Sequence, residues 1–163
     1  MKRLHLPLLF LSILALGPAR VQAKEPPKTP PDLTQDTSAV DRDSTYNLGA
    51  TGLRGWIYTR PANYLDSLQG RTTLASRQIF VTHVGAKSPA DGVVRVDDVI
   101  VGVAGRPFAD DARKSLARAI QEAEKEENKG VLKLLVSRGG KTEEVQIKLA
   151  VMGTPLFSSF SAS

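Results

Sequence analysis

Residues 110–130, DDARKSLARAIQEAEKEENKG, carry the one long helical pattern in this chain of 163 residues. The paired aspartates at the start offer a capping carboxylate, and Gly130 supplies a stop. The apolar side chains recur at intervals of three and four residues, as one face of a helix requires. They are Ala112, Leu116, Ala119, Ile120 and Ala123. The pattern predicts one long amphipathic helix whose charged end, 122–129, is solvated.

Short segments rich in β-branched and aromatic residues surround this helix and predict strands. They cover residues 55–58, 77–84, 96–105, 131–138 and 143–151. The sequence GGKT joins the last two as a hairpin, and SPADG at 88–92 predicts one short turn of helix that begins at Ser88. Together these elements predict an α+β fold: a small, partly open antiparallel β-barrel or sandwich of five to six strands, capped by one long and one short helix.

The first 23 residues have the three-part pattern of a secretory signal peptide. Lys2 and Arg3 precede an apolar run from Leu4 to Leu16, and small residues follow at 21–23. An uncleaved N-terminal anchor is the alternative interpretation, but the apolar run is shorter than the ~20 residues that a spanning helix needs. We therefore expect an exported protein, periplasmic or extracellular, with no membrane attachment after cleavage.

The remaining chain divides into three parts by composition. Residues 24–45 contain four prolines and few apolar residues, which predicts a disordered tether. Residues 46–153 have the composition of one globular domain, and 154–163 form a serine-rich tail. The chain has no cysteine, so the fold of an exported domain would rest on its apolar core alone.

Charge and residue types argue against several classes of function. Without the signal peptide the chain has 19 basic and 17 acidic residues, a balance that does not suggest nucleic-acid binding. His83 is the one histidine left, and no G-x-S-x-G motif is present. Asp97 and Asp98 adjoin in a predicted strand and would point to opposite faces, so they do not suggest a metal site. We expect no enzyme activity, no metal and no cofactor.

Three glycines, Gly49, Gly52 and Gly55, stand three residues apart just before the strand 55–58. A phosphate-binding loop places such glycines after a strand and before a helix, so this order argues against one. Because glycine reaches positive φ easily, successive amides here could form a concave nest for an anion. If the following strand has a free edge, a peptide could add to the sheet and place its terminal carboxylate in the nest.

The order of these segments, and four motifs within them, resemble a PDZ domain of the bacterial, circularly permuted type. Such domains are found near the N-terminus of secreted bacterial proteins of unknown function. The motifs are KSPADG at 87–92, VDDVI at 96–100, VAGRP at 103–107 and RGGK at 138–141. The family's usual Gly-Asp and Asn-Gly pairs are replaced here by Asp97-Asp98 and Ala104-Gly105.

The resemblance implies a non-catalytic module, which we expect to be a monomer. It would capture a peptide or protein C-terminus by β-strand addition, in a groove between strand 55–58 and helix 111–126. Carried over to this sequence, the groove residues are Leu53, Arg54, Gly55, Trp56 and Ile57 from the loop and strand, with Ala112, Leu116 and Ala119 from the helix.

Other interpretations stay open at this point. The apolar helix positions could serve core packing alone, Arg54 could be a solvated cation, and Gly55 could form a tight turn without a ligand. The chain could be the regulatory, substrate-recognising front end of a larger secreted protease or hydrolase. It could also be a structural module in which the bulky Trp56 closes the groove.

Overall fold

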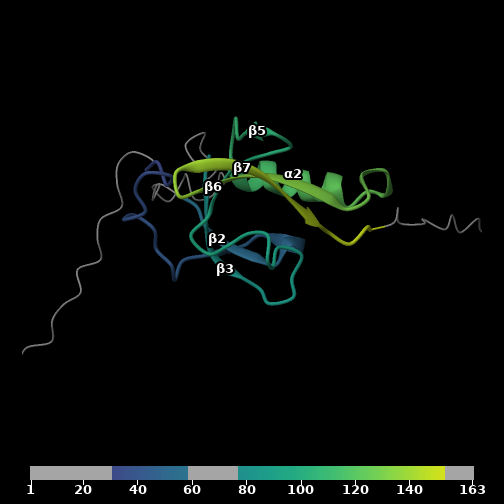
Figure 1. Ribbon diagram of the computed structural model, residues 1–163, viewed down its shortest axis with the longest axis horizontal. Helices are drawn as coiled ribbons and strands as arrows, with labels where there is room; N and C mark the ends of the chain where they lie inside the picture. The colour runs from purple at the N-terminus through teal and green to yellow at the C-terminus, as the bar shows by residue number, and fades with distance from the viewer. Residues whose placement is uncertain (1–30, 59–76, 153–163) are drawn as a thin grey trace, which may run out of the picture.

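The computed structural model describes residues 31–58 and 77–152, which form a single antiparallel sheet with one α-helix on one face (Figure 1). The sheet order is β1-β2-β3-β4-β6-β7, and β5 pairs with β4 alone. The predicted signal peptide 1–23 and serine-rich tail 154–163 lie outside the described residues. The elements are β1 (Tyr46–Asn47), η1 (Gly49–Thr51, 3₁₀), β2 (Leu53–Trp56), β3 (Ile79–Val84), β4 (Val99–Val103), β5 (Arg106–Pro107), α2 (Ala112–Ala123), η2 (Glu126–Asn128, 3₁₀), β6 (Val131–Arg138) and β7 (Lys141–Lys148).

The α+β class and the antiparallel sheet predicted from the sequence are confirmed, with seven described strands in place of five to six. The long helix is confirmed too, and the Asp111 side chain caps it by accepting the Lys114 N–H at 3.0 Å. It ends at Ala123 rather than Gly130, because Ala123 is the last buried residue on its apolar face. The short helix predicted at 88–92 is wrong: these residues form turns, and Gly92 leaves the helical region with a φ of +75°.

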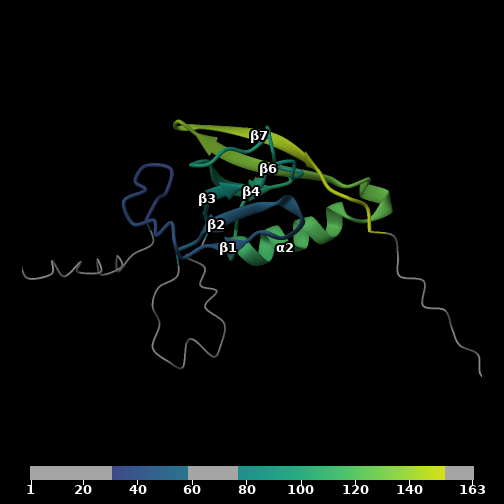
Figure 2. The same ribbon diagram turned by 90° about the horizontal axis from the view of Figure 1, so that it is seen from below.

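One face of the sheet packs against α2, which lies beside β1 at the end of the layer opposite β7 (Figure 2). Strand residues at alternate positions point to this face, as the two-residue period of a strand dictates. They pack with Leu116, Ile120 and neighbouring apolar residues of α2 to form the main core. Its most deeply buried strand residues are Leu53, Ile79, Val81, Ile100, Leu134, Val136 and Ile147.

The opposite face of β2, β3 and β4 is covered by residues 31–45, a segment predicted to be part of a disordered tether. The intervening strand residues Trp56, Phe80 and Val99 form a second buried cluster with Leu33, which is 2% exposed. The Leu33 N–H also donates to the Gln78 side chain at 2.7 Å. The prediction of disorder is therefore wrong for residues 31–45, because these strands are apolar on both faces and need a cover. Residues 24–30 lie outside the described residues.

Asp97 contacts this covering segment through an exposed ion pair. Its backbone has a φ of +74°, a conformation in which glycine is usual. The carboxylate accepts a hydrogen bond from Arg42 at 2.7 Å, and the Arg42 guanidinium lies 5.1 Å from the centre of the Phe80 ring. A glycine would relieve the backbone but would also remove this ion pair.

Asp98 points the other way and is buried, with an exposed fraction of 2%. It accepts the Arg95 N–H at 2.8 Å and two hydrogen bonds from Arg138, at 2.8 Å from Nε and 2.7 Å from Nη2. These bonds, with the nearby charges of Asp98 and Glu143, raise the pKa of Arg138. The pair thus joins the start of β4 to the end of β6 by a bidentate contact.

The β4–β5 turn offers a stabilising substitution. Ala104 and Gly105 both have positive φ, +50° and +72°, and Val103 pairs with Arg106 across them. Such a turn favours Asn-Gly, because the left-handed conformation is costly for alanine. We expect Ala104→Asn to raise the free energy of unfolding by about 0.5–1 kcal/mol. Urea denaturation of both proteins measures this, and an unchanged or lower midpoint for Ala104→Asn would contradict it.

Candidate functional site

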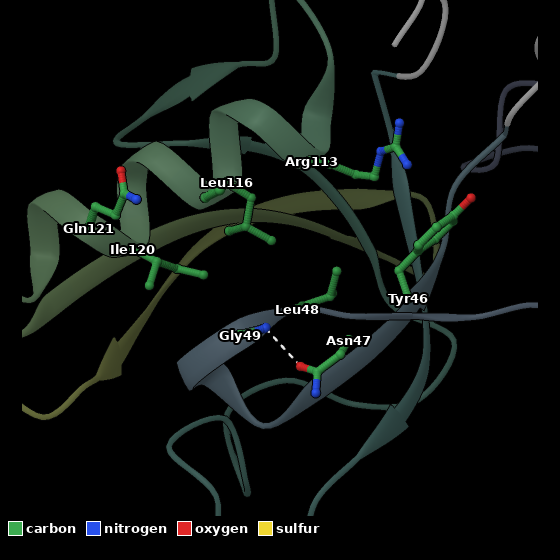
Figure 3. A pocket seen from close by; sticks show the side chains of 9 residues that line it. Tyr46, Asn47, Leu48, Gly49, Arg113, Leu116, Ile120 and Gln121 are labelled. Atoms are coloured by element: carbon green, nitrogen blue, oxygen red, sulfur yellow. Dashed lines mark hydrogen bonds between the residues drawn. The ribbon is translucent and has the colours of Figure 1, made fainter. Parts of the chain in front are cut away.

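A pocket of about 370 Å³ lies between the β1–η1 segment and α2 (Figure 3). The β1–η1 side contributes Tyr46, Asn47, Leu48 and Gly49; α2 contributes Arg113, Leu116, Ala117, Ile120 and Gln121. Leu48, Leu116 and Ile120 form an apolar floor that is continuous with the main core. Tyr46 and Arg113 lie at one end of the pocket, and Ile120 and Gln121 lie at the other.

The wall of the pocket is one arm of a hairpin. Tyr46 pairs with Gly55 and Asn47 with Arg54. Between the strands, Gly49 and Gly52 adopt φ values of +69° and +76°, which turn the chain back on itself. The Asn47 side chain supports the turn by accepting the Gly49 N–H at 2.9 Å.

β1 is the terminal strand of the described sheet. In an antiparallel pair, residues alternately direct their backbone groups toward and away from the partner strand. The Leu48 N–H donates to the Leu53 carbonyl at 3.0 Å. Asn47, one residue earlier, therefore directs its own N–H and C=O away from β2. These two groups lie on an edge of the sheet with which no other described strand pairs, at a residue that also lines the pocket.

Arg113 is the one charged residue among the described residues that line this pocket. Its guanidinium lies 5.0 Å from the centre of the Tyr46 ring, a cation–π arrangement. Nε is 3.7 Å from the Asp111 carboxylate, too far for a hydrogen bond. It is also buried without a hydrogen-bond partner among residues 31–58 and 77–152. Arg118, further along α2, is by contrast paired with Asp110 at 3.0 Å.

Asp110 precedes α2 and is not among the residues that line the pocket, but its carboxylate pairs with an arginine of the same helix. Hydrogen bonds from Ser115 and then Arg118 lower the pKa of the Asp110 carboxyl. This carboxylate therefore stays charged and holds Arg118 on the solvent side of the helix. Arg113, by contrast, lines the pocket together with the residues of its apolar floor.

Of the eight residues predicted to bind a peptide, Leu116 lines this pocket. Leu53, Ile57 and Ala112 are buried in the main core, and Ala119 packs against it. The remaining three lie elsewhere. Arg54 is exposed and donates to Thr45 at 2.9 Å, Gly55 is enclosed in the sheet, and Trp56 belongs to the cluster on the opposite face.

At Gly55 the predicted groove beside strand 55–58 has no free strand edge among the described residues, because β2 is paired on both sides there. Gly55 pairs with Tyr46 on one side and with Val81 on the other. At four positions of the glycine loop, the backbone N–H groups are not free to form the predicted anion nest. The N–H groups of Leu48, Gly49, Gly52 and Leu53 all donate within the loop or to its partner strand.

Trp56 is buried, as a closed structural module would require, but it does not fill the pocket. Its ring makes an edge-on contact with Tyr58, at 6.4 Å between centres, on the face covered by residues 31–45. The pocket beside α2 therefore stays open. Sequence reasoning missed Tyr46, Asn47 and Arg113, although Ile120 was part of the helical pattern.

Within the described ranges we find no group of three or more histidine, cysteine, aspartate or glutamate residues placed to hold a metal ion. His83 lies exposed on β3. No helix in this part of the chain is long and apolar enough to cross a membrane.

No protein-family model matches the chain, and comparison with curated proteins finds no significant match. The resemblance to PDZ domains therefore rests on the four motifs and the order of elements.

Proposed function

We propose that this is a non-catalytic, PDZ-like binding module of an exported protein. It binds an extended peptide or protein C-terminus by strand addition to β1, with an apolar side chain of the ligand in the pocket beside α2. The observation that supports this most is the free edge at Asn47 next to an apolar pocket. The groove is thus one strand further out than the sequence suggested.

The two edges of the described sheet differ in a way that supports this choice. β7, at the far edge, carries Lys141, Glu143, Glu144 and Lys148. Charged side chains of this kind discourage the addition of another strand. β1 carries the uncharged Tyr46 and Asn47 and borders apolar side chains. Since β1 is only two residues long, the pocket must supply much of the affinity, about 1.5–3 kcal/mol for one fully buried apolar side chain.

The experiment uses the full chain and a peptide selected from a library with free C-termini. Asn47→Pro removes the outward N–H without touching the bonds to β2, and Asn47→Ala is the matched control. Both variants lose the side-chain bond to Gly49. We expect Asn47→Pro to weaken binding at least tenfold by calorimetry, and Asn47→Ala to weaken it about threefold or less.

Equal affinities of the proline and alanine variants would contradict strand addition at β1. Ala117→Glu gives a second test, because Ala117 is an exposed residue on the α2 wall of the pocket. It should also weaken binding about tenfold through a charge placed beside the apolar ligand side chain. Unchanged binding by Ala117→Glu would exclude the pocket.

A further inference from the structure

Residues 31–45, here called the strap, lead directly into β1. The strap packs on the face of the sheet that carries Trp56, whereas Leu48, just after β1, is buried in the main core on the α2 side. The chain therefore passes from one face of the sheet to the other at β1. The edge strand proposed to receive a peptide lies between two anchors, Leu33 of the strap and Leu48 of the core.

Few contacts hold the strap to the sheet. Leu33 is the one buried residue within 31–45, at 2% exposed. Ala39 and Val40 are partly buried against the same cluster. The ion pair of Arg42 with Asp97 is exposed on both sides, and such pairs contribute little to stability. Leu33 is therefore the side chain on which docking of the strap depends most.

The strap also contains bonds of its own that would survive its release. Three aspartates each accept the backbone N–H of the residue two positions later, which makes a series of local turns. The distances are 3.0 Å for Asp32, 2.8 Å for Asp36 and 3.0 Å for Asp41. Opening gives up the contacts with the sheet but keeps these turns. The strap can thus leave as a unit while the rest of the domain stays folded.

β1 would lose support together with the strap. It contains two residues, and Arg54 of β2 holds the junction that precedes them. Nε of Arg54 donates to the Thr45 side chain at 2.9 Å, and Nη2 donates to the Thr45 carbonyl at 3.2 Å, both in exposed positions. The start of a domain is poorly ordered unless it is tied down. Without the strap, the outward backbone groups of Asn47 would lose their fixed direction.

We propose that docking of the strap orders β1 and thereby sets the affinity of the peptide edge, although strap and pocket lie on opposite faces of the sheet. The inference rests on the proposed function and adds its regulation: release of the strap weakens peptide binding, and a bound peptide holds the strap down. Thermodynamic linkage makes the two effects equal. Because the peptide needs an ordered β1, its affinity falls with the ordered fraction. We expect release of the strap to weaken binding about fivefold.

The first test is Leu33→Ala in the full chain. Leu149→Ala is the matched control, the same change at a buried core residue just after β7, at the far edge of the sheet. Leu33→Ala should weaken the selected peptide about fivefold by calorimetry, and Leu149→Ala should stay within about twofold of the wild type. Trp56, the one tryptophan of the chain, reports release of the strap. Its emission should shift to longer wavelength in Leu33→Ala, with the circular dichroism of the fold retained.

A second test needs neither a variant nor a peptide. The Leu33 N–H is bonded to the Gln78 side chain, and the Tyr46 N–H faces β2 in the pairing with Gly55. In the wild type, both amides should exchange with solvent hydrogen through one shared opening, more readily than the amides of β6.

Three results would overturn the inference. One is an unshifted Trp56 emission in Leu33→Ala, and another is an equal loss of affinity in Leu33→Ala and Leu149→Ala. The third is a Tyr46 N–H as protected as β6 while the Leu33 N–H exchanges readily. In each case strand addition still stands if Asn47→Pro weakens binding and Asn47→Ala does not. If no peptide binds the wild type, the proposed function fails, and hydrogen exchange still decides whether the strap orders β1.

Discussion

Asp98→Asn is expected to lower the free energy of unfolding by about 3–5 kcal/mol. The substitution keeps the shape of the side chain and removes the charge that faces Arg138. Asp98 is 2% exposed and accepts three hydrogen bonds, two of them from Arg138. Arg138 would keep Glu143, at 2.6 Å, and the Val93 carbonyl, at 3.1 Å. Neither replaces the bidentate contact, so a partly buried cation would lose its main partner.

The neighbouring residue provides the control. Asp97→Asn makes the same chemical change one position away, in an ion pair whose side chains are 55% and 62% exposed. Pairs of this kind contribute about 0–1 kcal/mol. Urea denaturation of the three proteins should separate the two variants by about 2 kcal/mol or more. Equal midpoints for Asp97→Asn and Asp98→Asn would contradict the assigned role of the Asp98–Arg138 pair.

Gly55→Glu is expected to cost at least about 4 kcal/mol and to prevent stable folding. A Cβ at this position would lie 2.6 Å from the Ile79 side chain and 3.1 Å from Leu48. The carboxylate would also have to enter the closed layer between β1 and β3. Gly55 is not among the glycines with positive φ, so the reason is space within the core.

A glycine in open surroundings serves as the comparison. Gly140 lies in the β6–β7 turn with a φ of +78°, and a Cβ added there would meet no other atom within 4 Å. Gly140→Glu should therefore cost only about 1–2 kcal/mol, from the left-handed backbone. Circular dichroism and one-dimensional NMR distinguish the outcomes. A folded Gly55→Glu protein with dispersed methyl signals would show that the core can accommodate the change.

Local patterns predicted the elements that depend on local physics. The strand over 131–138, the two-glycine turn after it and the aspartate cap of α2 all follow from residue type and spacing. The end of α2 was not predicted correctly. The charged residues after Ala123 favour a helix, but they have no apolar side chain that could be buried in the core. Helix propensity alone would extend α2 past Ala123, whereas the helix ends where its side chains no longer pack in the core.

The position of the proposed groove could not be predicted from the sequence, because it depends on one short pairing. β1 contains only Tyr46 and Asn47, too few residues to show a period of two. Its pairing with Arg54 and Gly55 moves the free edge of the sheet from β2 to β1. The covering segment 31–45 was missed for a related reason: its composition predicts disorder, but Leu33 is buried against strands that are apolar on both faces.

The most direct test of strand addition at β1 maps the binding site on the full, isotopically labelled chain by NMR. A peptide from the free C-terminal library is titrated, and backbone amide shifts are followed. We expect the largest changes at residues 46–49 and 113–121, which line the two walls of the pocket. Changes confined to β7, or to the face that carries Trp56 and residues 31–45, would contradict binding at β1.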